Sequence, residues 1–353
     1  MAMLLSAITS NLTRKRFMEC CRIPLRRNSY RKLAIRYLNP ERPARYPQTL
    51  QIEATSKCNL RCPSCPHARE VDQGAHLSPD ALRAMLGRLP WTPPRVVLSG
   101  VGEPLANPRY FELVDVLAER NIQCQFYSNG TLFSARIGAE ILSRRNIFKI
   151  EISCDGASAE IFEGLRVGAN FQHWRERIGQ FMGQAAAVRR EQRRRLGMGV
   201  FTVLSRTNAA EIPQIIRLSA ELGFDDITIL DAIPFDEVSA SLHVPPAEYA
   251  DLHPERLAAL GRAAGVKVVR LLRREATPPR AHVRCLLPWN FALIRNGGDV
   301  APCHALFSSD KAPIMGNVFQ GDFRDIWHSP RFREYRRTSA AGTNPHCRVC
   351  PYY

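Results

Sequence analysis

Residues 49–65 read TLQIEATSKCNLRCPSC, an alternating segment that runs directly into three closely spaced cysteines. The alternation of apolar and polar residues over 49–55 predicts a β-strand. Cys58, Cys62 and Cys65 follow with three and then two residues between them. A loop with this spacing can bring three thiolates to one corner of an iron–sulfur cube, and thiolates are the usual ligands of such clusters. Three ligands for four irons leave one iron open to a substrate or cofactor.

A repeating order of strand and helix follows this loop. Runs of β-branched and apolar residues predict strands over 96–98, 122–127, 147–153, 198–204 and 227–230. Helices are predicted after the N-cap Ser78, after Asn107-Pro108, over 171–195 and over 212–222, where Gly223 ends the last one. Such alternation demands a parallel sheet with helical crossovers, and six strands are too few for a closed barrel of eight. We therefore predict an α/β fold, a partial (β/α)6 TIM-like barrel, with one more helix and strand in 247–272.

The C-terminal part holds a second group of cysteines. Cys285 and Cys303 flank a predicted hairpin with its turn at 296–299, and Cys347 and Cys350 lie two residues apart further on. Four thiolates fill a four-iron cluster completely, but they would equally fill a tetrahedral zinc site.

The order of these segments predicts how the chain divides. We expect a basic N-terminal extension at 1–46, the barrel at 47–272 and a polar linker at 273–284 that contains Pro278-Pro279. Residues 285–353 are expected to form a small cysteine-rich α+β domain.

Length and composition limit the class of protein. The 353 residues are 45% hydrophobic with no run of 18 apolar residues, so we expect a globular chain with no membrane span. Eleven cysteines, seven of them in two ligand-like groups, fit a reducing compartment, so we expect a cytoplasmic protein. An Arg-rich start leaves an organelle transit peptide as the alternative.

The net charge of +16 raises the question of an acidic partner such as nucleic acid. The arginine runs lie far apart along the chain, and no nucleic-acid-binding module is visible in the sequence. We therefore interpret the charge as solvated arginine-rich faces rather than as a nucleic-acid site.

The cysteine loop resembles the signature of the radical S-adenosylmethionine (SAM) enzymes. The resemblance implies a partial barrel and a 4Fe-4S cluster on Cys58, Cys62 and Cys65, with the amino and carboxylate groups of SAM on the open iron. In that family an electron from the cluster cleaves SAM to a 5′-deoxyadenosyl radical, which abstracts a hydrogen atom. The chain departs from the family at Ser64, where an aromatic residue is common.

Polar residues and glycines follow the next strands, at the sheet edge where parallel α/β folds bind ligands. Residues 99–104 resemble the family's glycine-rich motif, which holds the SAM amino group, although Val101 separates the glycines; the matching residues are Gly100, Gly102, Glu103 and Pro104. Ser128 and Asn129 follow the third strand and are candidates for ribose hydroxyls. The resemblance also implies SAM contacts at Ser153 and Asp155, with Arg166 a candidate for the SAM carboxylate or else a surface arginine. Cys154 is expected in the core, because neighbours on a strand face opposite sides.

The C-terminal region resembles a truncated SPASM domain, often called Twitch. Besides the late cysteines, the matching segments are 315–318 and 325–327, which lead into a predicted helix at 329–337. The resemblance implies one auxiliary 4Fe-4S cluster with four ligands, Cys285, Cys303, Cys347 and Cys350.

Two radical reactions fit this reading. We expect an oxidoreductase that dehydrogenates a small molecule or sugar, with the auxiliary cluster as electron acceptor, as in the antibiotic dehydrogenases that the late cysteine spacing resembles. The alternative is a maturase that cross-links or epimerises a ribosomal peptide, although the 46 residues of the N-terminal extension look too short and too basic for the leader-recognition domain of many such enzymes. Either enzyme would need a reducing partner such as flavodoxin or ferredoxin. The catalytic base is left open among Asp231, Asp225 and Asp226.

A different class of protein remains as a third interpretation. The chain would then be a non-catalytic metal-cluster scaffold that binds an acidic partner through its arginines. Glu103, Ser153 and Asp155 argue against it, because a scaffold needs no SAM pocket.

Overall fold

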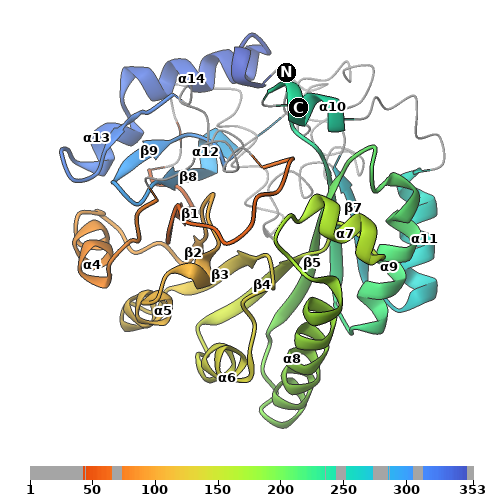
Figure 1. The fold of residues 1–353 in the computed structure, drawn as a ribbon. Coiled ribbons are helices and arrows are strands. Elements are labelled where there is room, and N and C mark those ends of the chain that lie inside the picture. The colour runs from red at the N-terminus through yellow and green to blue at the C-terminus, as the bar shows by residue number, and fades with distance from the viewer. Residues whose placement is uncertain are drawn as a thin grey trace, which may run out of the picture.

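The computed structural model of the protein describes residues 43, 45–65, 74–234, 236–243, 252–272, 285, 287–304 and 313–347. These residues form a single curved sheet of ten strands, with helices packed along its outer side (Figure 1). The strand order is β10-β9-β8-β1-β2-β3-β4-β5-β6-β7.

Most of the sheet is parallel and follows the order of the chain. Its successive parallel strands are β1 (Thr49–Ile52), β2 (Arg95–Leu98), β3 (Gln123–Ser128), β4 (Ile147–Ser153), β5 (Gly197–Leu204), β6 (Asp226–Asp231) and β7 (Val268–Leu272). On the other side of β1 lies β8 (Phe291–Ile294), also parallel, followed by the antiparallel strands β9 (Asp299–Ala301) and β10 (Gly316–Asn317).

Helices connect the strands and cover the outer face. They are α4 (Pro79–Gly87), α5 (Tyr110–Glu119), α6 (Ala135–Ser143), α7 (Ala159–Leu165), α8 (Phe171–Glu191), α9 (Ile212–Glu221), α10 (Glu237–Leu242), α11 (Pro254–Ala264), α12 (Leu287–Asn290), α13 (Phe323–Trp327) and α14 (Pro330–Ala341). Short 3-10 helices lie at η2 (Pro104–Ala106), η3 (Ala209–Glu211) and η6 (Pro345–Cys347). None of the helices in the described part of the chain is long and apolar enough to cross a membrane.

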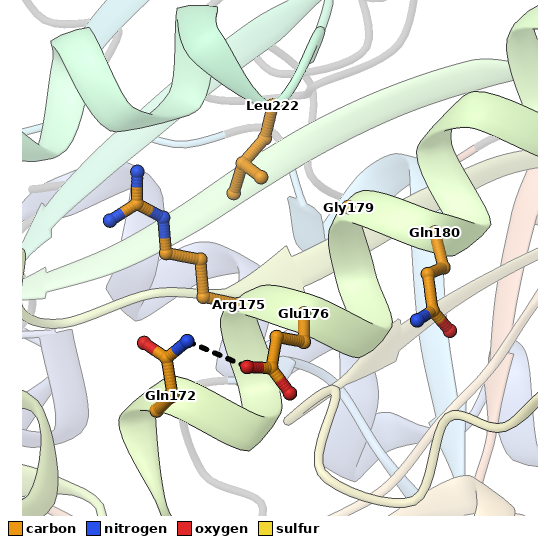
Figure 2. Close-up of a pocket in the computed structure, with 6 residues that line it drawn as sticks. All are labelled: Gln172, Arg175, Glu176, Gly179, Gln180 and Leu222. Atoms are coloured by element: carbon orange, nitrogen blue, oxygen red, sulfur yellow. Dashed lines mark hydrogen bonds between the residues drawn. The ribbon is translucent and has the colours of Figure 1, made fainter.

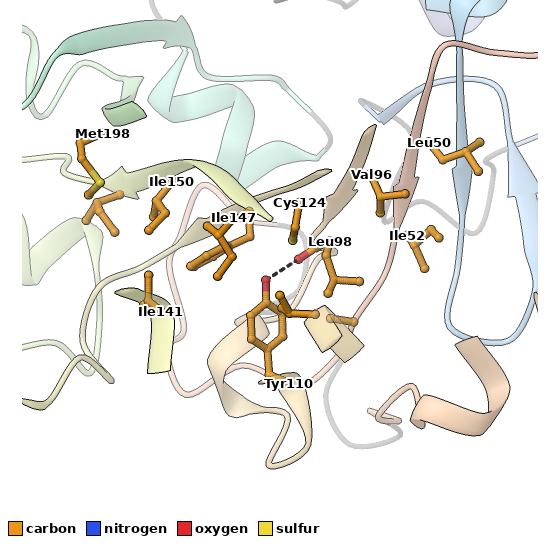
Figure 3. Packing of buried hydrophobic residues seen from close by; sticks show 14 of the residues in the cluster. Leu50, Ile52, Val96, Leu98, Tyr110, Cys124, Ile141, Ile147, Ile150 and Met198 are labelled. Carbon is orange, nitrogen blue, oxygen red and sulfur yellow. Dashed lines mark hydrogen bonds between the residues drawn. The ribbon is translucent and has the colours of Figure 1, made fainter. Parts of the chain in front are cut away.

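The main core lies between the sheet and these helices. Alternate strand residues such as Leu50, Ile52, Val96 and Leu98 are fully buried there, as Figure 3 shows. The hydroxyl of Tyr110 on α5 donates a hydrogen bond to Leu98 O at 3.3 Å, which satisfies a polar atom inside this layer. The opposite side chains of the same strands therefore face the hollow of the curved sheet.

The predicted α/β fold is confirmed in its order of elements. All six predicted parallel strands are present, and α11 with β7 supplies the additional helix and strand expected in 247–272. Ser78 caps α4 by accepting a hydrogen bond from Ala81 N, and Gly223 follows α9 with a φ of 82°.

One predicted helix cap is wrong. The N-cap position of α5 is Arg109, which makes no side-chain cap hydrogen bond, and Asn107 lies two residues earlier, where its Oδ1 accepts from Arg109 N at 2.9 Å. The Asn107 side chain is buried, and its Nδ2 donates to Ala54 O and Leu77 O, both at 2.9 Å. These two hydrogen bonds join the end of β1 to the segment before α4. A buried side-chain amide needs such acceptors for its N–H groups.

The predicted C-terminal hairpin is present as β8 and β9, and its turn contains Gly298 with a φ of 91°. The sequence did not predict that β8 pairs in parallel with β1, from Thr49 opposite Phe291 to Ile52 opposite Ile294. Residues 273–284 and nearly all of 1–46 lie outside the described residues, so the domain boundaries remain predictions.

Candidate functional site

The loop after β1 brings the first three cysteines to the carboxyl end of the sheet. Leu60 N donates to Cys58 Sγ at 3.4 Å and Cys65 N donates to Cys62 O at 3.0 Å, which folds the loop into a turn. Cys62 is buried, whereas Cys58 and Cys65 are half-buried. Burial raises the pKa of the Cys58 and Cys62 thiols. A bound positive centre such as iron would favour their thiolate forms.

The glycine-rich turn after β2 packs directly on the cysteine loop. A Cβ at Gly102 would collide with the backbone oxygens of Lys57 and Thr55, and Glu103 N donates to Lys57 O at 2.9 Å. A Cβ at Gly100 would collide with the side chain of Glu53. From the sequence we expected these glycines to let a ligand approach the backbone closely. In the structure they also let the two loops pack against each other, because glycine has no Cβ.

Glu103 is a buried acid at the centre of this region. It is 3% exposed, and its carboxylate accepts hydrogen bonds from Ser128 Oγ at 2.8 Å, Asn129 N at 2.7 Å and Leu105 N at 3.2 Å. Burial nevertheless raises the pKa of Glu103 to about 7. A bound ammonium group would favour the ionised carboxylate and lower that pKa.

Arg166 lies just after α7 and points into the same region. Its Nη2 pairs with Asp155 Oδ2 at 2.6 Å, and its guanidinium also hydrogen-bonds the Cys62 thiol. The side chain is only 11% exposed, so the alternative of a surface arginine is wrong. Its Nε is buried and has no hydrogen-bond partner in the part of the chain that the structure describes. That orphaned donor is suited to an incoming carboxylate.

The remaining residues that we predicted to contact SAM lie around Glu103 and Arg166. Ser128 and Asn129 hold Glu103, and Asn129 Nδ2 donates to Asn59 Oδ1 in the cysteine loop at 2.9 Å. Asp155 Oδ1 accepts from Val203 N at 2.8 Å and its Oδ2 pairs with Arg166, so both carboxylate oxygens have partners within the protein. Ser153 lies half-buried at the end of β4, and Pro104 begins η2. Cys154 is 1% exposed in the core, as expected.

Sequence reasoning missed Asn59 and Glu53. Asn59 ties the cysteine loop to β3 through the amide contact with Asn129. Glu53 is 3% exposed, and its carboxylate accepts hydrogen bonds from Val101 N at 3.4 Å and from Asn296 N at 3.2 Å. An acidic residue at the end of a buried strand was the available signal, because a buried carboxylate requires partners.

Three of the four late cysteines lie within electrostatic range of one side chain, Tyr335 of α14. Its hydroxyl interacts electrostatically with the thiols of Cys285, Cys303 and Cys347, and it hydrogen-bonds Cys347. Cys350, the fourth predicted ligand, lies outside the described residues. Within the described ranges, no three His, Cys, Asp or Glu side chains lie close enough together to hold a single metal ion.

The candidate bases lie in different places. Asp225 and Asp226 sit at the amino end of β6, away from the cysteine loop. Asp225 pairs with Arg189 at 2.7 Å, and Asp226 pairs with Lys149 at 3.0 Å. Asp231 ends β6 at 3% exposure, on the strand face shared with Ile227 and Ile229. The base therefore remains unassigned.

A separate surface depression lies between α8 and the end of α9. It is lined by Gln172, Arg175, Glu176, Gly179, Gln180 and Leu222, and Gln172 Nε2 donates to Glu176 Oε1 at 2.6 Å (Figure 2). None of the predicted site residues lines it, and it lies on the outer helical side of the sheet.

Two family models match the chain. Residues 52–217 match the model described as the radical SAM superfamily. Residues 285–351 match the model described as an iron–sulfur cluster-binding domain, SPASM. The first range begins in β1 and includes the cysteine loop, and the second includes all four late cysteines.

Curated proteins of similar sequence span most of the chain. A tungsten-containing aldehyde ferredoxin oxidoreductase cofactor-modifying protein of Pyrococcus furiosus is 23% identical, over 85% of this chain and 86% of its own. The mycofactocin maturase MftC of Mycobacterium tuberculosis is 25% identical, over 87% and 76%. The PqqA peptide cyclase of Gluconobacter oxydans is 24% identical, over 87% and 92%.

Solved structures share the fold. SuiB of Streptococcus suis, bound to its precursor peptide SuiA, has a TM-score of 0.62 at 15% identity and covers 92% of this chain and 74% of its own. Native anSMEcpe with bound AdoMet has a TM-score of 0.60 at 16% identity, over 86% and 88%. These identities are low, so the likeness establishes the fold, and the predicted partial barrel is confirmed.

Proposed function

The chain belongs to the radical SAM superfamily and carries a C-terminal SPASM domain, and from this premise we propose that it is a maturase of a ribosomally made precursor peptide. Family membership brings a SAM-binding 4Fe-4S cluster, an auxiliary iron–sulfur cluster and SAM as cofactors. The observation that carries the proposal is the similarity, along 87% of the chain, to a mycofactocin maturase and a PqqA peptide cyclase. These relatives favour peptide modification over the small-molecule dehydrogenation that we expected from the sequence.

The residues of the first site fit SAM. When bound, the cluster and SAM supply hydrogen-atom abstraction. Glu103 would hold the ammonium group of SAM, and the orphaned Nε of Arg166 would donate a hydrogen bond to its carboxylate, with Asp155 orienting Arg166. Gly100, Gly102 and Pro104 shape the turn, and Ser128, Asn129 and Ser153 add polar groups at the same edge.

The late cysteines fit an auxiliary cluster. Cys285, Cys303 and Cys347 face one tyrosine, but no described set of three donors is close enough to hold one ion. The match of residues 285–351 to an iron–sulfur cluster-binding model favours a multi-iron cluster over the zinc alternative. Cys350 would be the fourth ligand. A small acidic reductant such as flavodoxin or ferredoxin would supply electrons, and the many thiols favour the reducing cytoplasm.

The test is to reconstitute the protein anaerobically and add SAM and dithionite with one of two substrates. The first is the set of peptides encoded by short reading frames beside its gene, and the second is an aminocyclitol alcohol. We expect 5′-deoxyadenosine together with a peptide altered in mass or in residue stereochemistry. Oxidation of the aminocyclitol with every peptide unchanged would favour the dehydrogenase, and the absence of 5′-deoxyadenosine in all mixtures would favour the scaffold.

A further inference from the structure

One face of α14 presents two hydroxyl groups to the late cysteines. Tyr335 and Ser339 lie four residues apart, so their side chains neighbour each other on the helix. Both are buried, at 7% and 2% exposure. The Tyr335 hydroxyl hydrogen-bonds Cys347, and Ser339 Oγ lies 3.7 Å from Cys347 Sγ. A single thiol therefore meets two hydroxyl groups from the same helix.

Which atom donates in each of these hydrogen bonds depends on which of the two groups carries a proton. A Cys347 that ligates iron is a thiolate without a proton, so in each of these contacts the hydroxyl group would be the donor and the sulfur the acceptor. Ser339 Oγ also accepts a hydrogen bond from Asn344 Nδ2 at 3.2 Å, which helps to fix the position of this hydroxyl group. Cys347 N donates to Asn344 O at 3.1 Å, so the same asparagine also positions the cysteine.

The helix that carries these hydroxyls is firmly anchored. Arg336, next to Tyr335, is fully buried and donates to Pro288 O at 2.8 Å and to Trp327 O at 2.9 Å. Its guanidinium lies over the rings of Trp327 and Phe332, at 4.2 and 4.1 Å from their centroids. These contacts hold α14 against the segment that leads into β8, and they limit the freedom of Tyr335 to turn away from the thiols.

We propose that Tyr335 and Ser339 donate hydrogen bonds to the ligating sulfur of Cys347 in the auxiliary cluster and thereby raise its reduction potential. The inference rests on the proposed function, because it requires a cluster on the late cysteines. Hydrogen bonds to cluster sulfurs are among the factors that set reduction potentials. A donor at a thiolate withdraws negative charge and so favours the reduced cluster, which carries one more electron. The two hydroxyls would make this centre a better electron acceptor.

The test uses the full-length chain with Cys58, Cys62 and Cys65 changed to alanine, so that only the auxiliary cluster titrates. Its midpoint potential is measured by redox titration monitored by electron paramagnetic resonance after anaerobic reconstitution. We expect Tyr335→Phe and Ser339→Ala each to shift the potential to more negative values, with a larger shift in the double variant. Tyr127→Phe is the control. It also removes a tyrosine hydroxyl group, but one on β3 that accepts a hydrogen bond from Gln125 Nε2.

The outcomes separate this inference from the proposed function. An unchanged potential in both variants with full iron content would overturn the inference and leave the auxiliary cluster in place. A triple-alanine parent that binds no iron would instead overturn the auxiliary cluster itself. If Tyr335→Phe binds no iron while its parent does, Ser339→Ala alone decides: a negative shift supports the inference, and no shift overturns it.

Discussion

At the residue scale, Glu103 and Arg166 are buried charges of opposite sign placed around the cysteine loop. Glu103 has three hydrogen-bond donors and still has a pKa raised to about 7 by burial. Arg166 keeps one buried nitrogen without a described partner, although its Nη2 pairs with Asp155. A ligand that carries both an ammonium and a carboxylate would complete both sites and offset the cost of burying these charges.

We predict that SAM binding weakens as the pH falls below about 7. The carboxylate form of Glu103 pairs with the ammonium group, so below the pKa the acid must first lose its proton. Glu103→Gln should weaken SAM binding at higher pH by about 2–5 kcal/mol, the usual effect of truncating one partner of a buried charge pair. It should also flatten the pH dependence. Equilibrium titration of the reconstituted protein with SAM measures both.

The matched control for this prediction is Glu112→Gln. Glu112 pairs with Arg109 at 2.7 Å on the exposed side of α5, so its loss should leave SAM affinity unchanged. The same pH dependence in Glu103→Gln as in the native protein would contradict the assignment of the titrating group.

At the scale of elements, the joint between β1 and β8 connects the two cysteine-bearing regions. Besides the strand pairing, Glu53 N donates to Ile294 O at 2.9 Å, and Glu53 Oε2 accepts from Asn296 N. Asn296 Nδ2 then donates to Ser56 Oγ at 3.3 Å and Ala75 O at 3.0 Å. The turn of the C-terminal hairpin is thus fixed to the segment that enters the cysteine loop.

Asn296→Ala should loosen this joint without unfolding the sheet. It removes two side-chain hydrogen bonds, each worth about 0.5–1.5 kcal/mol net, so the free energy of unfolding should fall by about 1–3 kcal/mol. Urea denaturation measures the loss, and hydrogen exchange should rise at 53–57 and 295–299. Gln172→Ala, which removes an exposed contact on α8, is the control and should change stability by less than about 0.5 kcal/mol. Faster exchange confined to other strands would contradict the proposed joint.

At the scale of the whole molecule, one sheet carries both groups of cysteines. Cys58, Cys62 and Cys65 follow β1, whereas Cys303 follows β9 in the neighbouring hairpin. The two groups of cysteines are therefore held by adjacent parts of one hydrogen-bonded sheet.

Substitutions of single cysteines should separate the two centres. Cys62→Ala should abolish 5′-deoxyadenosine formation, whereas Cys347→Ala should keep the first cluster and lower iron by roughly four per chain. Cys124→Ala is the control, because burial raises the pKa of Cys124 to about 12 and keeps it a protonated core thiol. Iron and sulfide analysis after anaerobic reconstitution measures the difference. Full iron content in Cys347→Ala would contradict the auxiliary cluster.

The sequence by itself determined the parallel order of strands and the two cysteine groups, because periodicity, glycine positions and ligand spacing are local properties of the chain. Only the tertiary structure decided the contacts between distant segments: β8 beside β1, Glu53 bonded to Asn296, Arg166 paired with Asp155, and Tyr335 among the late thiols. Each of these contacts joins residues that packing brings together, and a single sequence carries no local signal for such pairs. The N-cap of α5 is Arg109 rather than the predicted Asn107, and only the tertiary structure showed that the Asn107 Nδ2 group bonds two distant carbonyls.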